Sequence, residues 1–221
     1  MQQEHRVSFR RDLELLVADL ADLAELVATA ADDASRALLT AQPELAGDVV
    51  GRRWAIEMEA DRIDAKTSEL LTLQAPVARD LRLLVSILRS CSALRRIGDL
   101  ALHIASVAVR RAPAPAVPDG FTPTVKALAD SVSRVTHTAS AAIRAGAEPD
   151  PGLRQQDDEV DALHRRLLTQ LADGSAGLAA DTTIDLTLLG RYYERIGDQA
   201  LNAAGWRRDP VRAAVQAGER R

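Results

Sequence analysis

A ten-residue pattern occurs twice in the chain and restricts the folds that are open to it. The later copy reads Arg195-Ile-Gly-Asp-Gln-Ala-Leu-Asn-Ala-Ala204, and the earlier copy reads Arg96-Ile-Gly-Asp-Leu-Ala-Leu-His-Ile-Ala105. The two copies start 99 residues apart, at 96 and at 195. This separation is too long for one unit of a solenoid, so the sequence predicts a duplicated subdomain.

The composition indicates that both subdomains are helical. Hydrophobic residues make up 47% of the chain but aromatic residues only 3%, so a core has to be built mainly from Leu, Ala, Val and Ile. Ala and Leu favour helices, whereas strands are enriched in aromatic and β-branched residues. We therefore predict an all-α protein.

Apolar residues recur at three- and four-residue steps along six segments, which is typical of amphipathic helices. In the first half they predict helices over about 9–39, 49–73 and 76–111, with a break over 40–47. In the second half they predict helices over about 125–143, 160–171 and 186–206. Four prolines between 113 and 123 separate the halves. Because short loops force neighbouring helices to run antiparallel, we predict two tandem antiparallel three-helix bundles over 8–111 and 124–207, a Pro-rich linker over 112–123 and a tail over 208–221.

Charge and cysteine content exclude several classes of protein. The 28 basic and 32 acidic residues give a net charge of −4, which does not favour nucleic-acid binding. The single cysteine, Cys91, cannot form an intramolecular disulfide and lies in an apolar run, which predicts a buried, inert thiol. The N-terminus does not resemble a signal peptide, and no segment has the roughly 18 apolar residues of a membrane span. We expect a cytoplasmic protein.

Carboxylates gather around the second copy of the pattern. Glu194 and Asp198 are four residues apart and therefore lie on one face of a helix, with Asn202 one turn further. One interpretation is a solvated charged face, because Arg191 and Arg195 are close in sequence. The other interpretation is a site that binds a cation.

Two further features favour the cation site. Gly98 and Gly197 lie mid-helix, where glycine costs roughly 1 kcal/mol relative to alanine, which suggests a close approach by another helix. The helix before each copy also carries an acid pair, and the pairs are 97 residues apart: Asp61 with Asp64, and Asp158 with Asp161. An antiparallel bundle could bring each pair beside Asp99 or Asp198. Clustered carboxylates suit hard cations such as Mg²⁺, Mn²⁺, Ca²⁺ or iron.

The duplicated Arg-Ile-Gly-Asp pattern, with Glu194 before it and Asn202 within it, resembles the PhoU family over about residues 10–206. The segment Gln74-Ala-Pro-Val-Ala-Arg-Asp-Leu-Arg82 is also similar to that family. The resemblance implies an accessory regulator without catalytic residues, which represses phosphate uptake and the phosphate-starvation response. Its implied partners are the ATPase of a phosphate ABC transporter and a phosphate-sensing histidine kinase, and it implies a homodimer without membrane insertion.

The resemblance further implies metal clusters at Glu-x-x-x-Asp motifs. The second motif matches fully, but the first has Arg95 in place of Glu and His103 in place of Asn. Arg95 could pair with Asp99 and replace the cation, or Asp99 and His103 could form a different ligand pair. A histidine at such a position is more often a half-buried helix residue than a ligand. We expect one complete and one degenerate site for iron, Mn, Mg or Zn, with these candidate ligands: Glu194, Asp198, Asn202, Asp158, Asp161, Asp99, His103, Asp61 and Asp64.

Two alternatives remain open. The chain could be a carboxylate-rich metal-binding protein or oxidase unrelated to phosphate signalling. Helical di-metal oxidases use Glu-x-x-His pairs, and no Glu in this sequence is followed three residues later by His. The chain could also be a plain helical scaffold in which the duplicated pattern serves only packing.

Overall fold

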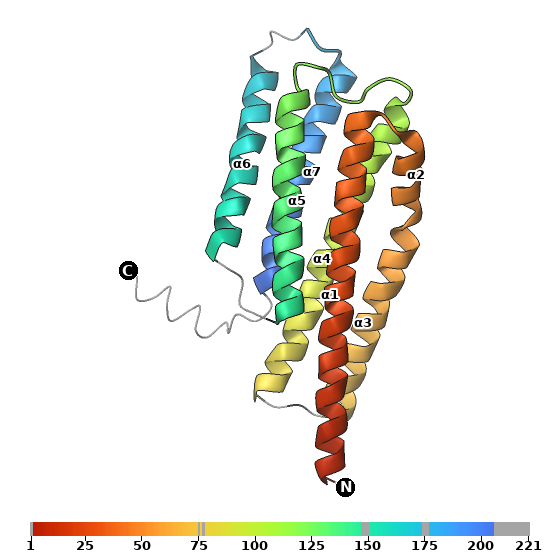
Figure 1. Cartoon of the computed structure of the whole chain (residues 1–221), viewed down its shortest axis with the longest axis vertical. Coiled ribbons are helices and arrows are strands. Elements are labelled where there is room, and N and C mark those ends of the chain that lie inside the picture. Colours follow the sequence, from red (N-terminus) through yellow and green to blue (C-terminus); the bar gives the residue numbers. More distant parts are fainter. Residues whose placement is uncertain (1, 75, 77, 147–150, 174–176, 206–221) are drawn as a thin grey trace, which may run out of the picture.

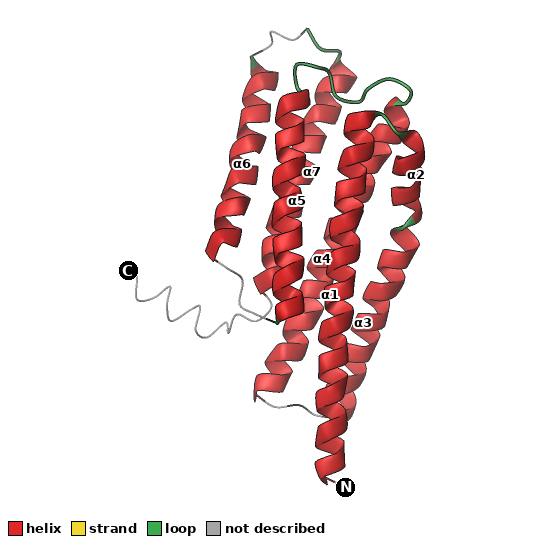
Figure 2. Cartoon of the chain, viewed as in Figure 1, coloured by secondary structure: helices red, strands yellow, loops and turns green. Residues whose placement is uncertain are grey.

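The computed structural model describes residues 2–74, 76, 78–146, 151–173 and 177–205, so the predicted tail over 208–221 lies outside the described residues. Helices account for nearly all of the described part, and no strand occurs within it (Figure 2). The all-α prediction and the two-repeat organisation are confirmed. The helices in chain order are α1 (Gln2–Thr40), α2 (Pro43–Gly51), α3 (Arg53–Gln74), α4 (Ala78–Arg111), α5 (Thr122–Ala145), α6 (Pro151–Ala172) and α7 (Ala180–Ala204).

The first half contains one more helix than the sequence predicts. The break predicted over 40–47 is much shorter, because α1 ends at Thr40, Ala41 adopts a left-handed conformation (φ 51°) and α2 begins at Pro43. Proline suits the first turn of a helix, where no backbone N–H is needed. The predicted helix over 49–73 is divided at Arg52, which separates α2 from α3 and whose guanidinium lies 2.7 Å from the buried carboxylate of Asp33 on α1.

The two repeats share one apolar core. Helices α1 and α4 of the first repeat pack against α5 and α7 of the second, and these four helices form the centre of the bundle (Figure 1). Helices α2 and α3 cover α1 and α4 on one side, and α6 covers α5 and α7 on the other. The core contains many small side chains, such as Ala30, Ala34 and Ala203, which let the long helices approach closely. The two predicted bundles are therefore joined along their length.

The linker between the repeats is anchored to this core. It connects α4 to α5 over 112–121, and its residues Ala116, Val117 and Phe121 are buried. Its prolines Pro113 and Pro115 are exposed. The connection predicted from the prolines is present, but part of it packs as core rather than lying free on the surface.

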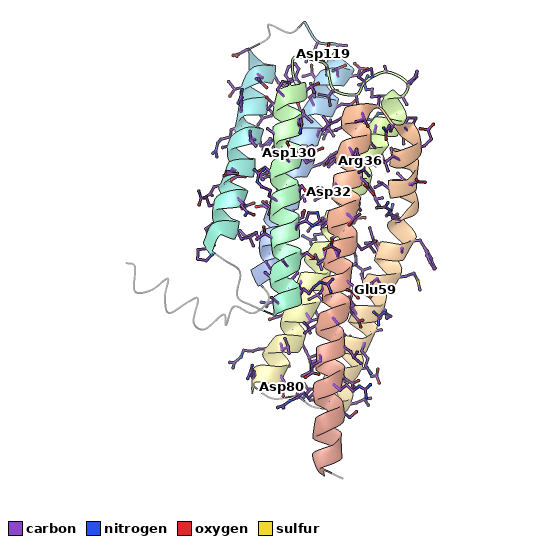
Figure 3. All side chains as sticks on the ribbon, viewed as in Figure 1. Asp32, Arg36, Glu59, Asp80, Asp119 and Asp130 are labelled. Carbon is purple, nitrogen blue, oxygen red and sulfur yellow. The ribbon has the colours of Figure 1, made fainter. Side chains whose placement is uncertain are left out.

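Buried and half-buried polar contacts also join the repeats. The Tyr193 hydroxyl on α7 donates to Ser35 Oγ on α1 at 3.1 Å, and Ser90 Oγ on α4 donates to the Ala203 carbonyl at 2.8 Å. Asp32 on α1, labelled in Figure 3, lies 2.7 Å from His137 Nε2 on α5. These contacts fix the rotation of the central helices, because each polar atom has a partner on the other repeat.

Ionic contacts at one end of the central helices add to this link. Asp185, buried on α7, accepts from Arg110 at 2.5 Å and from Arg111 Nε at 2.6 Å, both at the end of α4. Arg111 also bonds Asp181 at 2.8 Å, and this bond lowers the pKa of the Asp181 carboxyl. The buried carboxylate is thus fully compensated.

Two expectations about the chain as a whole can be compared with the structure. Cys91 is buried, and burial raises the pKa of its thiol to about 12, so the thiolate is scarce at neutral pH and the predicted inert thiol is confirmed. Among the described residues, no helix has a long enough apolar stretch to cross a membrane.

The hydrogen bond from the Tyr193 hydroxyl to Ser35 predicts a measurable contribution to stability. Tyr193→Phe should lower the free energy of unfolding by about 1 kcal/mol, because it removes one buried hydrogen bond but leaves the ring packed. Urea unfolding of both proteins measures this difference. The matched control is Tyr192→Phe on the neighbouring, partly exposed residue, which should leave the midpoint within error. Equal effects of the two substitutions would contradict the role of the Tyr193 hydroxyl.

Candidate functional site

A carboxylate on α6 approaches the backbone of α7 at the second copy of the pattern. A Cβ atom placed on Gly197 would lie 2.7 Å from Asp157 Oδ1, which is too close for any real side chain. The close approach predicted for Gly197 is therefore present, and any larger residue there would require the Asp157 carboxylate to move. Asp157 is not among the candidates that the sequence singles out.

Five carboxylates make up what we call the second acidic cluster, which joins α6 to α7. The pKa of Asp157 is raised to about 6, first by burial and then by the negative charges of Asp198, Asp161, Asp158 and Glu194. The structure therefore brings together four of the predicted ligands around Asp157. Asn202 is exposed one turn beyond Asp198 and lines a separate groove.

Little positive charge compensates this cluster. Arg191 lies 2.6 Å from Glu194, but within the described residues no ion pair is formed by Asp157, Asp158, Asp161 or Asp198. Their oxygens also do not converge: the described part of the chain holds no group of three or more His, Cys, Asp or Glu side chains arranged to hold a metal ion. The cluster thus has the charge and the donor atoms that suit a hard cation, without a preformed chelate.

The first repeat balances its charges differently. Arg95 on α4 reaches across to α3, where its guanidinium lies 2.6 Å from Glu57, 3.0 Å from Asp61 and 3.1 Å from Asp64. We call this set the first acidic cluster. The suggested ion pair between Arg95 and Asp99 is absent from the described residues, because the guanidinium binds carboxylates on the preceding helix instead. Glu57 was not singled out from the sequence.

His103, which replaces the Asn of the second motif, and Asp99 also have defined surroundings in the structure. The ring of His103 is exposed, not half-buried, and stacks on Tyr192 of α7 with ring centroids 5.3 Å apart. His103 therefore contacts the second repeat. Asp99 forms no ion pair among the described residues, and its pairing with His103 as metal ligands stays a prediction.

The two repeats are not in the register that the acid pairs suggest. A Cβ on Gly98 would meet Ile56 at 3.0 Å, just as one on Gly197 would meet Asp157. Ile56 and Asp157 are 101 residues apart (157 minus 56), whereas the acid pairs are 97 apart, a difference of about one helical turn. Relative to the residue that faces the glycine, the pair Asp61–Asp64 therefore lies about one turn further along its helix than the pair Asp158–Asp161 does. The residue that faces the glycine is also apolar (Ile56) in the first repeat but acidic (Asp157) in the second.

Comparison with known proteins identifies the family. The model of the PhoU domain matches residues 20–108 and 127–206, one match in each repeat. The chain belongs to the PhoU family. It is 34% identical over 202 residues to phosphate-specific transport system accessory protein PhoU homolog 1 of Mycobacterium leprae, covering 90% of each chain. It is 33% identical over 200 residues to PhoU homolog 2 of Mycobacterium tuberculosis, covering 90% of this chain and 94% of the relative.

Solved PhoU structures have the same fold. PhoU from Pseudomonas aeruginosa superposes with a TM-score of 0.79 at 28% identity, covering 90% of this chain and 96% of the other. The phosphate transport system regulatory protein PhoU from Streptococcus pneumoniae superposes with a TM-score of 0.71 at 23% identity, covering 89% and 93%. The predicted resemblance to the PhoU family is confirmed over nearly the whole chain.

The raised pKa of Asp157 predicts how stability depends on pH. The folded protein binds this proton more tightly than the unfolded chain, whose Asp pKa is near 3.8, so stability falls as pH rises from about 4 to about 6 and stays lower above it. Asp157→Asn removes the ionised charge. The variant should therefore be more stable than wild type at pH 7.5 and gain nothing at pH 4, as measured by urea unfolding at low ionic strength.

The matched control for this experiment is Asp173→Asn, which changes an exposed aspartate just beyond the end of the same helix. It should shift the midpoint little at either pH. Parallel pH profiles for wild type and Asp157→Asn would show that Asp157 is not held among uncompensated carboxylates.

Proposed function

We propose that this PhoU protein is a negative regulator of phosphate uptake and of the phosphate-starvation response. The observation that carries the proposal is the similarity to proteins named phosphate-specific transport system accessory proteins, at 33–34% identity over 90% of this chain. The alignment includes both repeats and the core between them. A role that uses the whole bundle is therefore supported, rather than one that needs a single repeat.

The proposed regulator acts as a cytoplasmic adaptor without catalysis of its own. Its partners are the ATPase of the phosphate ABC transporter and a phosphate-sensing histidine kinase, and it works as a homodimer. Exposed apolar side chains support contact with other proteins: Trp54 and Met58 lie one turn apart on α3 with 73% and 50% of their surfaces exposed. Large apolar side chains on a rim of charged residues are typical of protein-binding surfaces.

Deletion of the gene provides the functional test. In cells grown on abundant phosphate, loss of the protein should raise the output of a phosphate-responsive alkaline phosphatase reporter, because a repressor of the response is missing. The intact gene restored in trans should return the output to its low level. Unchanged output in the deletion strain would contradict the proposal, and it would favour a carboxylate-rich metal-binding protein or oxidase unrelated to phosphate signalling if purified protein still retained metal.

We also propose that the two acidic clusters neutralise their charge by different means. In the first cluster, the guanidinium of Arg95 supplies the positive charge from within the chain. In the second, the uncompensated carboxylates around Asp157 support binding of a divalent or transition metal ion. Asp157, Asp161, Glu194 and Asp198 would hold that ion, which would screen their mutual repulsion when bound.

This division predicts the metal content. Protein loaded with Mn²⁺ and then dialysed should retain about one site per chain, measured by mass spectrometry of the digested sample. Asp198→Ala should abolish retention, whereas Asp99→Ala should leave it unchanged. Arg95→Glu restores the acidic residue of the first motif and should add a second binding site. Two equal sites in wild type, lost independently through Asp99→Ala and Asp198→Ala, would contradict the proposed difference between the clusters.

A further inference from the structure

A groove of about 620 Å³ opens between three helices at the end of the bundle where α7 ends. It lies between the first half of α4, the start of α6 and the last turns of α7. This is also the end of α4 that carries Asp80, labelled in Figure 3. Its volume falls within the range of small-molecule sites. The groove is lined by Leu81, Arg82, Val85, Ser86, Arg89, Ser90, Arg154, Leu201, Asn202 and Gly205.

The lining is basic and its positive charges are uncompensated. Arg82, Arg89 and Arg154 all contribute to it, and no Asp or Glu among the described residues does. Within the described ranges, none of the three guanidinium groups forms a hydrogen bond or an ion pair, although arginines elsewhere, such as Arg62 and Arg95, are held by carboxylates. The three side chains are exposed and thus free to close on a ligand.

The spacing of the three arginines indicates how long a bound anion would have to be to contact all of them. Arg82 and Arg89 are seven residues apart, so they lie on one face of α4 about 10 Å from each other along the axis. Arg154 comes from α6, on another wall of the groove. A single small anion could contact only part of this set, whereas an anion with several charged groups in a row could contact all three.

The polar atoms of the lining specify the chemistry of that anion further. Each guanidinium offers five N–H donors and no acceptor. Among the described lining residues, the side-chain oxygens available to accept are those of Ser86, Ser90 and Asn202, and the Ser90 hydroxyl already donates to the Ala203 carbonyl. The groove therefore suits a ligand rich in acceptors and poor in donors. A peptide would bring backbone N–H groups for which few acceptors exist, whereas a phosphoryl group brings three acceptor oxygens and negative charge.

We propose that this groove binds an anion that carries two or more phosphoryl groups in a row. Condensed inorganic phosphate and the phosphate chain of a nucleotide share this chemistry. Leu81, Val85 and Leu201 provide an apolar wall, against which the non-phosphate part of a nucleotide could lie. The site lies about one helical turn from the second acidic cluster, because Arg154 precedes Asp157 by three residues on α6 and Asn202 follows Asp198 by four on α7. The proposal does not depend on the proposed adaptor role.

Titration calorimetry on the full chain, freed of divalent cations, tests the proposal. The probes are tripolyphosphate, ATP, orthophosphate and a hexaglutamate peptide. Tripolyphosphate, ATP or both should bind at least tenfold more tightly than orthophosphate and the peptide, and binding should weaken as salt is raised. Tighter binding of tripolyphosphate identifies a condensed phosphate as the ligand class, and tighter binding of ATP identifies a nucleotide.

Substitutions locate the binding. Arg89→Gln and Arg154→Gln should each weaken binding by about tenfold or more, because each removes charge-assisted hydrogen bonds to phosphate. The matched control is Arg166→Gln, an exposed arginine twelve residues further along α6 that has no partner among the described residues, and it should bind as wild type does. Thermal unfolding checks that all three variants are folded, which their exposure predicts.

Three results would overturn the proposal. They are no detectable binding of either polyphosphate at low salt, equal affinity for the hexaglutamate peptide, and equal loss of affinity in Arg166→Gln and the groove variants. The second result would indicate a groove for acidic protein segments, and the third would indicate diffuse attraction to the surface.

Discussion

Burial of one continuous apolar face on α1, α4, α5 and α7 is the constraint on which the rest of the structure depends. Small side chains on these helices let their backbones approach closely. The outer helices α2, α3 and α6 then pack on the outward faces of the central helices. Gly98, Gly190 and Gly197 are points of close approach, where a side chain of an outer helix lies against the glycine. These contacts fix the positions of Ile56 and Asp157 along the bundle axis, because Ile56 lies against Gly98 and Asp157 lies against Gly197. The acidic clusters are therefore consequences of helix packing, and their composition can diverge without disturbing the core.

The two repeats show how such divergence operates. Similar helix pairs carry acidic residues in both, yet one pair encloses a guanidinium and the other has no comparable internal cation. Carboxylates held together without a counter-charge destabilise a fold unless protons or cations are taken up. In the first cluster, Arg95 places a positive charge among Glu57, Asp61 and Asp64, so the chain itself neutralises these carboxylates. The two repeats thus share helix packing but differ in how their acidic residues are paired.

Much of the fold could be predicted from sequence, because helical periodicity is local and depends on the large apolar side chains that define each face. The second helix was the exception, since Gly47 indicates a break while Pro43 in fact begins a helix. The candidate site was predicted less completely. Asp158 and Asp161 were selected by their 97-residue spacing from the first repeat, but the level of each helix is set by tertiary contacts, which placed Asp157 against Gly197. The basic groove leaves no local signal, because α4, α6 and α7 contribute to it from distant parts of the chain.

The linker between the repeats is buried only in its later part, which affects how far the bundle depends on an unbroken chain. Ala116, Val117 and Phe121 fasten its later part to the core, while Pro113 and Pro115 remain exposed before them. The repeats are also joined by a shared interior and by buried polar contacts such as Tyr193 with Ser35, so their association does not rest on the covalent link alone. Covalent continuity at 113–115 is thus dispensable in principle. Two separately synthesised halves would reassemble into the same bundle, and a circularly permuted chain could start at this point.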